Sequence, residues 1–127
     1  MRNIPAERLH FQQRLREEIA RAERYHRPFG LLVVEVLPTS DGMAVHAKLD
    51  LGLSILRATT RESDSVSVLY EDTIAAILVE TDAANAAAAE VRIRAKFAGR
   101  GRGWHLSLYA YPERREDIER MALSLAA

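Results

Sequence analysis

Cysteine is absent from this chain of 127 residues, which excludes a disulfide framework and thiolate chemistry. Net charge is absent too, because 18 basic and 18 acidic residues balance, so whole-molecule charge gives no attraction to nucleic acid or to a membrane. No apolar run approaches the roughly 20 residues that span a bilayer, and Met1 to Arg14 lacks the apolar core of a signal peptide. We therefore expect a cytoplasmic protein with neither nucleic acid nor membrane among its partners.

The residues that are present have the composition of an ordinary globular domain. Hydrophobic residues make up 48% of the chain and charged residues 28%. This length suits one domain with one core, and neither a linker nor an internal repeat is visible. We predict a single domain over residues 1–127, with a lead-in helix at 1–27 and a sheet-and-helix core at 28–127.

Hydrophobic periodicity assigns the helices and strands. In the first helix, a helical stripe faces the core and charged residues fill the other faces; the stripe is Phe11, Leu15, Ile19 and Ala22, and the charged residues are Arg14, Arg16, Glu17 and Glu18. Thr81-Asp82 offers N-cap chemistry for an alanine-rich helix. Its predicted core residues are Ala86, Ala89, Ile93 and Phe97. The continuous apolar run from Phe29 indicates a buried strand.

The order of the elements predicts the fold. The expected helices are Pro5–Tyr25, Val45–Thr60, a helix from Thr81-Asp82 to about Phe97, and Glu116–Ala126, and the expected strands are Phe29–Leu37, Ser65–Leu69, Thr73–Val79 and Trp104–Tyr111, with a turn-rich break at Pro38–Gly42. The core succession is therefore βαββαβ. This is the ferredoxin-like α+β plan, an antiparallel sheet with helices on one face. A lead-in helix and a short C-terminal helix flank it.

These segments together resemble the GGDEF domain of diguanylate cyclases across almost the whole chain. The entry RLREEIARAERYHRPFGLLVVEV is similar to the lead-in helix and first strand of that family, and RESDSVSVL stands where the family has its Arg-x-x-Asp motif and the following strand. AAILVETDAANAAAAEVRIR is similar to the next strand and helix, and WHLSLYAY to the last strand. The resemblance implies bacterial second-messenger signalling by cyclic di-GMP.

The active centre that the resemblance implies is degenerate. Tyr70 and Glu71 stand in place of two glycines that let the substrate approach the hairpin backbone. Asp72 matches the metal-binding acid, and Glu35 matches a first-strand aspartate conservatively. The loop at 37–45 lacks the residues that hold guanine. We therefore expect no cyclase activity, no catalytic residues and no cofactor.

A second binding motif of the family is retained. The resemblance implies that Arg61 and Asp64 form a site for cyclic di-GMP, completed by an arginine of the next helix at the position of Arg92. A guanidinium can contact two phosphodiester oxygens or two acceptors of a guanine, and a carboxylate can accept from the N1 and N2 donors of guanine. The first hypothesis is therefore a catalytically inactive receptor for cyclic di-GMP, which acts on a protein partner or as a homodimer.

Each of these residues also has a simpler interpretation. Arg61 is favourable at a helix end, Asp64 suits a turn, and Arg92 with Arg94 and Lys96 can form a solvated basic face. A second hypothesis is therefore a nucleotide-independent interaction or dimerisation module. A third retains Mg²⁺ or GTP binding at Glu35 and Asp72, whose carboxylates are oxygen ligands of the kind that Mg²⁺ prefers.

Overall fold

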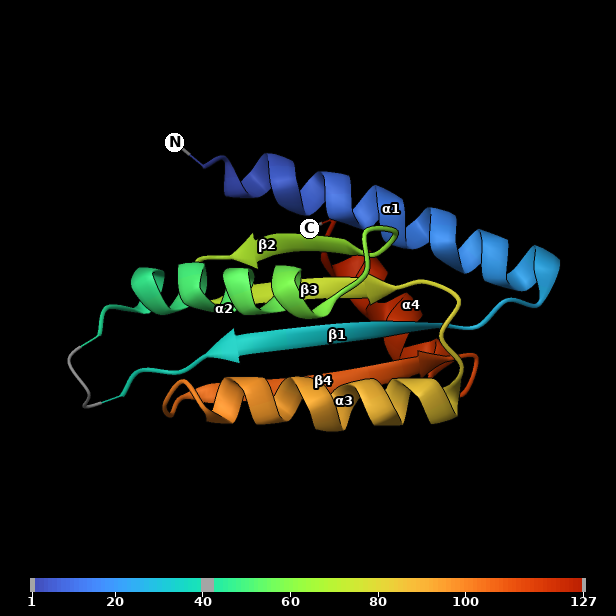
Figure 1. Cartoon of the computed structure of the whole chain (residues 1–127). Helices are drawn as coiled ribbons and strands as arrows, with labels where there is room; N and C mark the ends of the chain where they lie inside the picture. The colour runs from blue at the N-terminus through green and yellow to red at the C-terminus, as the bar shows by residue number, and fades with distance from the viewer. Residues whose placement is uncertain (1, 40–42, 127) are drawn as a thin grey trace.

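A computed structural model describes residues 2–39 and 43–126 of the chain. Within these ranges, four strands form one antiparallel sheet in the order β2-β3-β1-β4, so the predicted ferredoxin-like α+β fold is confirmed. The predicted break at Pro38–Gly42 lies partly outside the described residues. None of the described helices is both long and apolar enough to cross a bilayer. The elements are α1 (Ile4–Tyr25), β1 (Phe29–Val36), α2 (Val45–Thr59), β2 (Ser65–Tyr70), β3 (Thr73–Leu78), α3 (Ala83–Ala98), β4 (Trp104–Tyr111) and α4 (Arg115–Ser124) (Figure 1).

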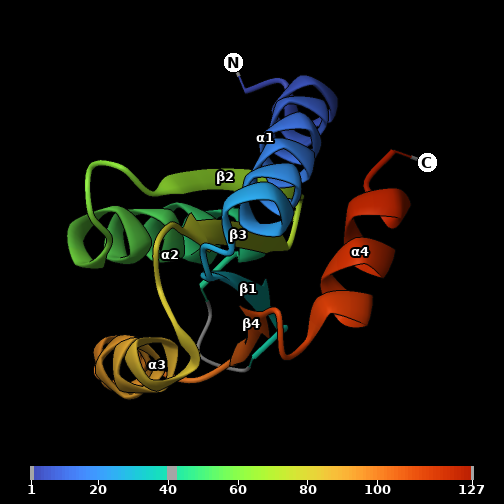
Figure 2. The same cartoon turned by 90° about the vertical axis from the view of Figure 1, so that its right-hand side faces the viewer.

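Helices cover both faces of the sheet (Figure 2). α2 and α3 pack on one face around Leu32 and Val34, as predicted for the helices of the core, and α1 and α4 pack on the other around Leu31 and Val33. Alternate residues of a strand point to opposite faces. Coverage on both sides therefore explains why β1 is buried and apolar on both faces from Phe29 to Val34.

α3 has the core stripe that its spacing predicts. Its buried residues are Ala86, Ala89, Ile93 and Phe97. The helix begins after Asp82, whose carboxylate accepts a 2.8 Å hydrogen bond from the backbone N–H of Asn85. This bond satisfies one of the free donors of the first turn. It fixes the start of α3, which borders the pocket that contains the predicted binding residues.

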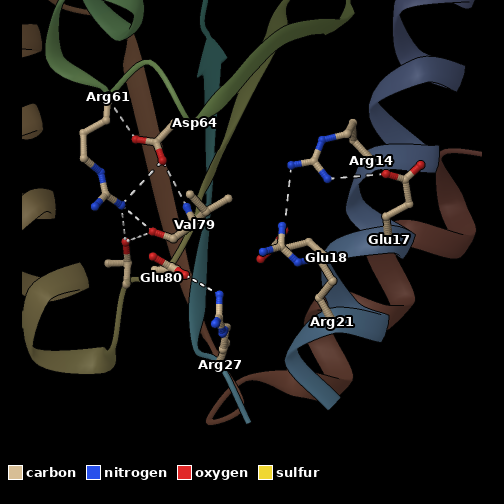
Figure 3. A network of polar contacts seen from close by, with 10 residues as sticks. Arg14, Glu17, Glu18, Arg21, Arg27, Arg61, Asp64, Val79 and Glu80 are labelled. Carbon is tan, nitrogen blue, oxygen red and sulfur yellow. Dashed lines mark hydrogen bonds and ion pairs between the residues drawn. The ribbon is translucent and has the colours of Figure 1, made fainter. Parts of the chain in front are cut away.

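Glu18 is the residue of α1 for which the prediction is wrong. We expected it on a face away from the core, yet its side chain is only 2% exposed. It follows Leu15 by three residues and precedes Ala22 by four, so it shares the buried stripe of the helix. Arg14 and Arg21 place guanidinium nitrogens 3.7 and 3.6 Å from its carboxylate (Figure 3). These two cations offset part of the cost of burying the charge.

Arginines bind one backbone carbonyl on each outer strand of the sheet. Arg8 of α1 donates a 3.0 Å hydrogen bond to the carbonyl of Leu69 in β2. Arg94 of α3 donates a 2.9 Å hydrogen bond to the carbonyl of Leu106 in β4. The Arg8 guanidinium also lies 4.8 Å from the centre of the Tyr70 ring, which is a cation–π distance. α1 is thereby joined to the end of β2 that leads into the hairpin.

The glycine-rich loop before β4 is joined to the segment that follows β1. The Gly103 carbonyl accepts a 2.7 Å hydrogen bond from the backbone N–H of Leu37. The neighbouring carbonyl, that of Arg102, accepts a 2.8 Å hydrogen bond from the buried Lys48 ammonium. Gly103 has a φ of +90°, a conformation that glycine adopts readily. Two polar contacts thus hold this loop beside residues 37–39.

Candidate functional site

The turn after α2 is closed by its own aspartate. The helix ends where the Thr60 hydroxyl donates a 2.7 Å hydrogen bond to the carbonyl of Leu56. The backbone N–H of Asp64 then bonds the carbonyl of Arg61 at 3.0 Å. In return, the Asp64 carboxylate accepts from the backbone N–H of Arg61 at 2.9 Å. This reciprocal pair fixes the conformation of residues 61–64.

The second oxygen of Asp64 joins this turn to the end of β3. Asp64 Oδ1 accepts a 3.0 Å hydrogen bond from the backbone N–H of Val79 and lies 3.5 Å from Nη2 of Arg61. The side chain is only 3% exposed. The carboxylate therefore presents almost no surface to a ligand, and its role here is to hold Arg61 in place.

Arg61 is fixed at one nitrogen and open elsewhere. Its Nη2 donates to the carbonyl of Val79 (Figure 3). The same nitrogen donates a 3.0 Å hydrogen bond to the hydroxyl of Thr81. The side chain is nevertheless 58% exposed. Among the described residues, no contact engages its Nη1 or Nε. A guanidinium held in this way is oriented in advance and still has donors for an oxygen-rich ligand.

The structure brings all three predicted binding residues to one pocket. Arg61, Asp64 and Arg92 line a cavity of about 370 Å³ between the end of α2, the end of β3 and the first turns of α3. Arg92 is exposed and has no ion pair within the described part of the chain. Arg94 instead bonds Glu90 and the carbonyl of Leu106. Arg92 thus differs from Arg94 in having no ion pair among the described residues, and from Lys96 in lining the pocket.

Polar residues that the sequence analysis did not find also line this pocket. They are Thr59, Thr60, Glu80, Thr81 and Asn85. Asn85 stands in the first turn of α3, where its backbone N–H is bonded to the Asp82 carboxylate, so its side-chain amide is the group that it can offer to a ligand. The pocket therefore combines two arginines with several polar side chains. Its volume lies in the range of about 300–1,000 Å³ that is typical of small-molecule sites.

The hairpin between β2 and β3 forms a different kind of pocket. Glu71 and Asp72 connect the strands, and the register is irregular between Val68 and Tyr70. The cavity beside the hairpin is lined by Val36, Pro38, Val45, Tyr70, Glu71 and Asp72. Two acids and no basic residue are found among these lining residues. Their charge opposes a triphosphate.

Of the two candidate metal ligands, Asp72 lines the cavity beside the hairpin and Glu35 does not. Strand alternation places Glu35 on the face that carries Leu31 and Val33. Asp72 lines its pocket with Val36, which belongs to the opposite face, and its carboxylate accepts a 2.9 Å hydrogen bond from the Thr73 hydroxyl. Among the described residues there is no group of three or more acidic or histidine side chains able to hold a metal ion.

Comparison with known proteins supports the fold. No protein-family model matches the sequence, and no curated protein sequence matches it. Solved structures do match. A DGC protein from Thermotoga maritima is similar at a TM-score of 0.76 and 24% identity, over 92% of this chain and 89% of that one.

Two further matches are a GGDEF domain and a diguanylate cyclase. The GGDEF domain of DgcB from Caulobacter crescentus, solved in complex with cyclic di-GMP, is similar at a TM-score of 0.64 and 15% identity, over 92% of this chain and 82% of that one. The diguanylate cyclase SiaD from Pseudomonas aeruginosa, solved with its activator SiaC, is similar at a TM-score of 0.60 and 17% identity, over 94% of this chain and 54% of that one. The chain has a GGDEF-like fold.

Proposed function

We propose that this protein is a catalytically inactive GGDEF-like domain that binds cyclic di-GMP in the pocket of Arg61 and Arg92. One observation carries the proposal: the three residues that the sequence analysis predicted as one site line one cavity. The similar DgcB domain was solved in complex with this ligand. The proposal places the domain in the cytoplasm, as a receptor that alters its association with a partner or with a second copy when the ligand binds.

The chemistry of the pocket suits a cyclic dinucleotide. Arg61 and Arg92 have guanidinium donors that no described residue engages, and these can contact phosphodiester oxygens or the acceptors of a guanine base. Each charge-assisted hydrogen bond of this kind contributes about 1.5–3 kcal/mol. A few such bonds with base stacking reach micromolar affinity. Asp64 supports this site by orienting Arg61 through the turn.

Removal of Arg92 tests the receptor proposal directly. We expect Arg92→Ala to raise the Kd for cyclic di-GMP at least about tenfold, because at least one charge-assisted contact is lost. Isothermal titration measures the Kd of the wild type and of Arg92→Ala. Arg92 is exposed and unpaired within the described structure, so the fold is expected to persist.

Lys96→Ala is the matched control for this experiment. It removes one exposed positive charge from the same helix, at a position that does not line the pocket. Its Kd should equal that of the wild type. Equal affinities of wild type and Arg92→Ala would contradict the assignment of Arg92. Absence of heat with the wild type at tens of micromolar protein would contradict the receptor proposal itself.

The hairpin is the basis for proposing that the domain is not a cyclase. Tyr70 ends β2 and Glu71 begins the turn, and acidic groups line the cavity beside them. We expect no conversion of GTP when the protein is incubated with GTP and Mg²⁺, because charge and bulk oppose a triphosphate there. Chromatography of the mixture should show an unchanged GTP peak. Appearance of pyrophosphate and a cyclic dinucleotide would contradict inactivity.

A nucleotide-independent interaction module is the second candidate, and one surface favours it. A groove between α1 and α4 is lined by Ile19, Ala20 and Leu123 together with charged residues. Leu123 is 74% exposed, although a large apolar side chain gains from burial. Light scattering after size exclusion, with and without cyclic di-GMP, separates the two candidates. A dimer that forms equally without ligand would favour the module.

A further inference from the structure

The buried state of Asp64 leaves the recognition of the base unexplained. Of the described residues that line the pocket, two carry a carboxylate, Asp64 and Glu80. The Asp64 side chain is 3% exposed, and protein donors engage both of its oxygens. The Glu80 side chain is 58% exposed. An incoming base therefore meets one accessible carboxylate, and it belongs to Glu80.

Glu80 is held in an uncommon conformation at the edge of the pocket. Its φ is +49°, a region that residues other than glycine rarely adopt and that is frequent at ligand sites. The residues on either side are fixed, since Arg61 bonds the carbonyl of Val79 and the hydroxyl of Thr81. The backbone N–H of Thr81 also bonds the carbonyl of Pro28 at 3.1 Å. The surrounding contacts therefore maintain the strained backbone.

An arginine from outside the pocket orients the Glu80 carboxylate. Arg27 lies between α1 and β1, and its Nη1 is 2.7 Å from Oε1 of Glu80 (Figure 3). An ionised carboxylate has about four acceptor positions on its two oxygens. One bond to Arg27 leaves Oε2 and part of Oε1 for further donors. Arg27 also compensates the negative charge of Glu80 and so lowers its repulsion of a phosphate.

We infer that Glu80 reads the Watson–Crick edge of a guanine base and that Arg27 is its positioning residue; this inference rests on the proposed function. Guanine presents two adjacent donors on that edge, N1–H and the N2 amino group, and these match the acceptors of a carboxylate. Adenine presents an acceptor at N1 beside a single amino donor, so its N1 would oppose Glu80. The pocket therefore selects cyclic dinucleotides that contain guanine.

Paired titrations with two ligands test this role. We expect Glu80→Gln to raise the Kd for cyclic di-GMP about tenfold or more, because contacts to a charged acceptor are lost. The Kd for cyclic di-AMP should fall or stay the same, so the selectivity of the wild type for guanine should decrease. Cyclic di-IMP, which lacks the N2 amino group, should bind wild type more weakly than cyclic di-GMP, and this difference should shrink in Glu80→Gln.

Three further variants complete the design. Glu62→Gln changes an exposed acid of the neighbouring turn that does not line the pocket, and its affinities should match those of the wild type. Arg27→Gln should reduce the selectivity less than Glu80→Gln does. The double variant should be no worse than Glu80→Gln alone, since Arg27 acts through Glu80. A purely structural role of Arg27 would leave the ratio of the two Kd values unchanged.

The outcomes separate this inference from the proposed function. Tighter binding of cyclic di-GMP by Glu80→Gln would show that Glu80 only repels phosphate, and would overturn the inference while the receptor proposal stands. An unchanged preference for guanine in Glu80→Gln would overturn it in the same way. Absence of binding by the wild type would overturn the proposed function and the inference together. A loss of both affinity and selectivity supports the inference.

Discussion

Replacement of Asp64 by alanine is expected to lower the free energy of unfolding by about 2–4 kcal/mol. The carboxylate accepts backbone hydrogen bonds from Arg61 and Val79, which lie on different segments. Val79 is buried, so its N–H group would lose its partner without gaining water. Urea denaturation measures the effect as a lower midpoint at an unchanged slope.

Glu62→Ala is the control for this prediction, because Glu62 belongs to the same turn and is exposed. It should change stability by no more than about 0.5 kcal/mol. A loss below about 1 kcal/mol in Asp64→Ala would contradict the role assigned to the carboxylate. The prediction also matters for ligand studies, since weak binding by an Asp64 variant would report a loosened turn as well as any lost contact.

Replacement of Gly103 by alanine is expected to lower the free energy of unfolding by a similar amount, about 2–4 kcal/mol. The backbone has a φ of +90°, and an added Cβ would lie 2.5 Å from Cγ2 of Thr39 and 2.8 Å from the carbonyl oxygen of Leu37. The second atom belongs to the backbone, so relief of the clash requires movement of the chain. That movement would also weaken the bond from Leu37 N–H to the Gly103 carbonyl.

Comparison with Gly101→Ala separates the cost of the steric clash at Gly103 from the cost of the positive φ. Gly101 has a φ of +100°, but apart from its chain neighbours no heavy atom of the described residues lies within 4 Å of an added Cβ. Alanine there should cost about 1–2 kcal/mol, the penalty of the left-handed conformation alone. Urea denaturation measures the loss in free energy of unfolding for both variants. Equal losses would show that the clash with residues 37–39 adds nothing to the cost of Gly103→Ala.

Periodicity was sufficient to predict the fold, because the apolar stripes of α3 and the apolar run of β1 are local properties of the sequence. Glu18 was misplaced because it is polar, although its spacing from Leu15 and Ala22 puts it on the buried stripe, where Arg14 and Arg21 offset part of the cost of burying its charge. The opposite face of the sheet was also not assigned to α1 and α4. Local sequence patterns do not show that α1 and α4, at opposite ends of the chain, pack on the same face of the sheet.

The candidate site was predictable only in part. The family spacing placed Arg61, Asp64 and Arg92, and these residues share one pocket. The burial of Asp64 could not be predicted, because its partner Val79 is brought to it by the pairing of β2 with β3. Glu80 was missed for another reason. Its left-handed backbone and its bond to Arg27 leave no pattern in the neighbouring residues.

The arginines on the outer strands restrict how other chains can attach to this domain. A peptide that extends a sheet must hydrogen-bond the free carbonyls of an edge strand. Arg8 and Arg94 already bind the carbonyls of Leu69 and Leu106, and the carbonyl of Ala110 bonds the N–H of Arg114. An added strand would have to displace these groups, which protects the domain from growing into aggregates edge to edge. Recruitment of a partner is therefore expected through helix surfaces or loops and not through β-addition.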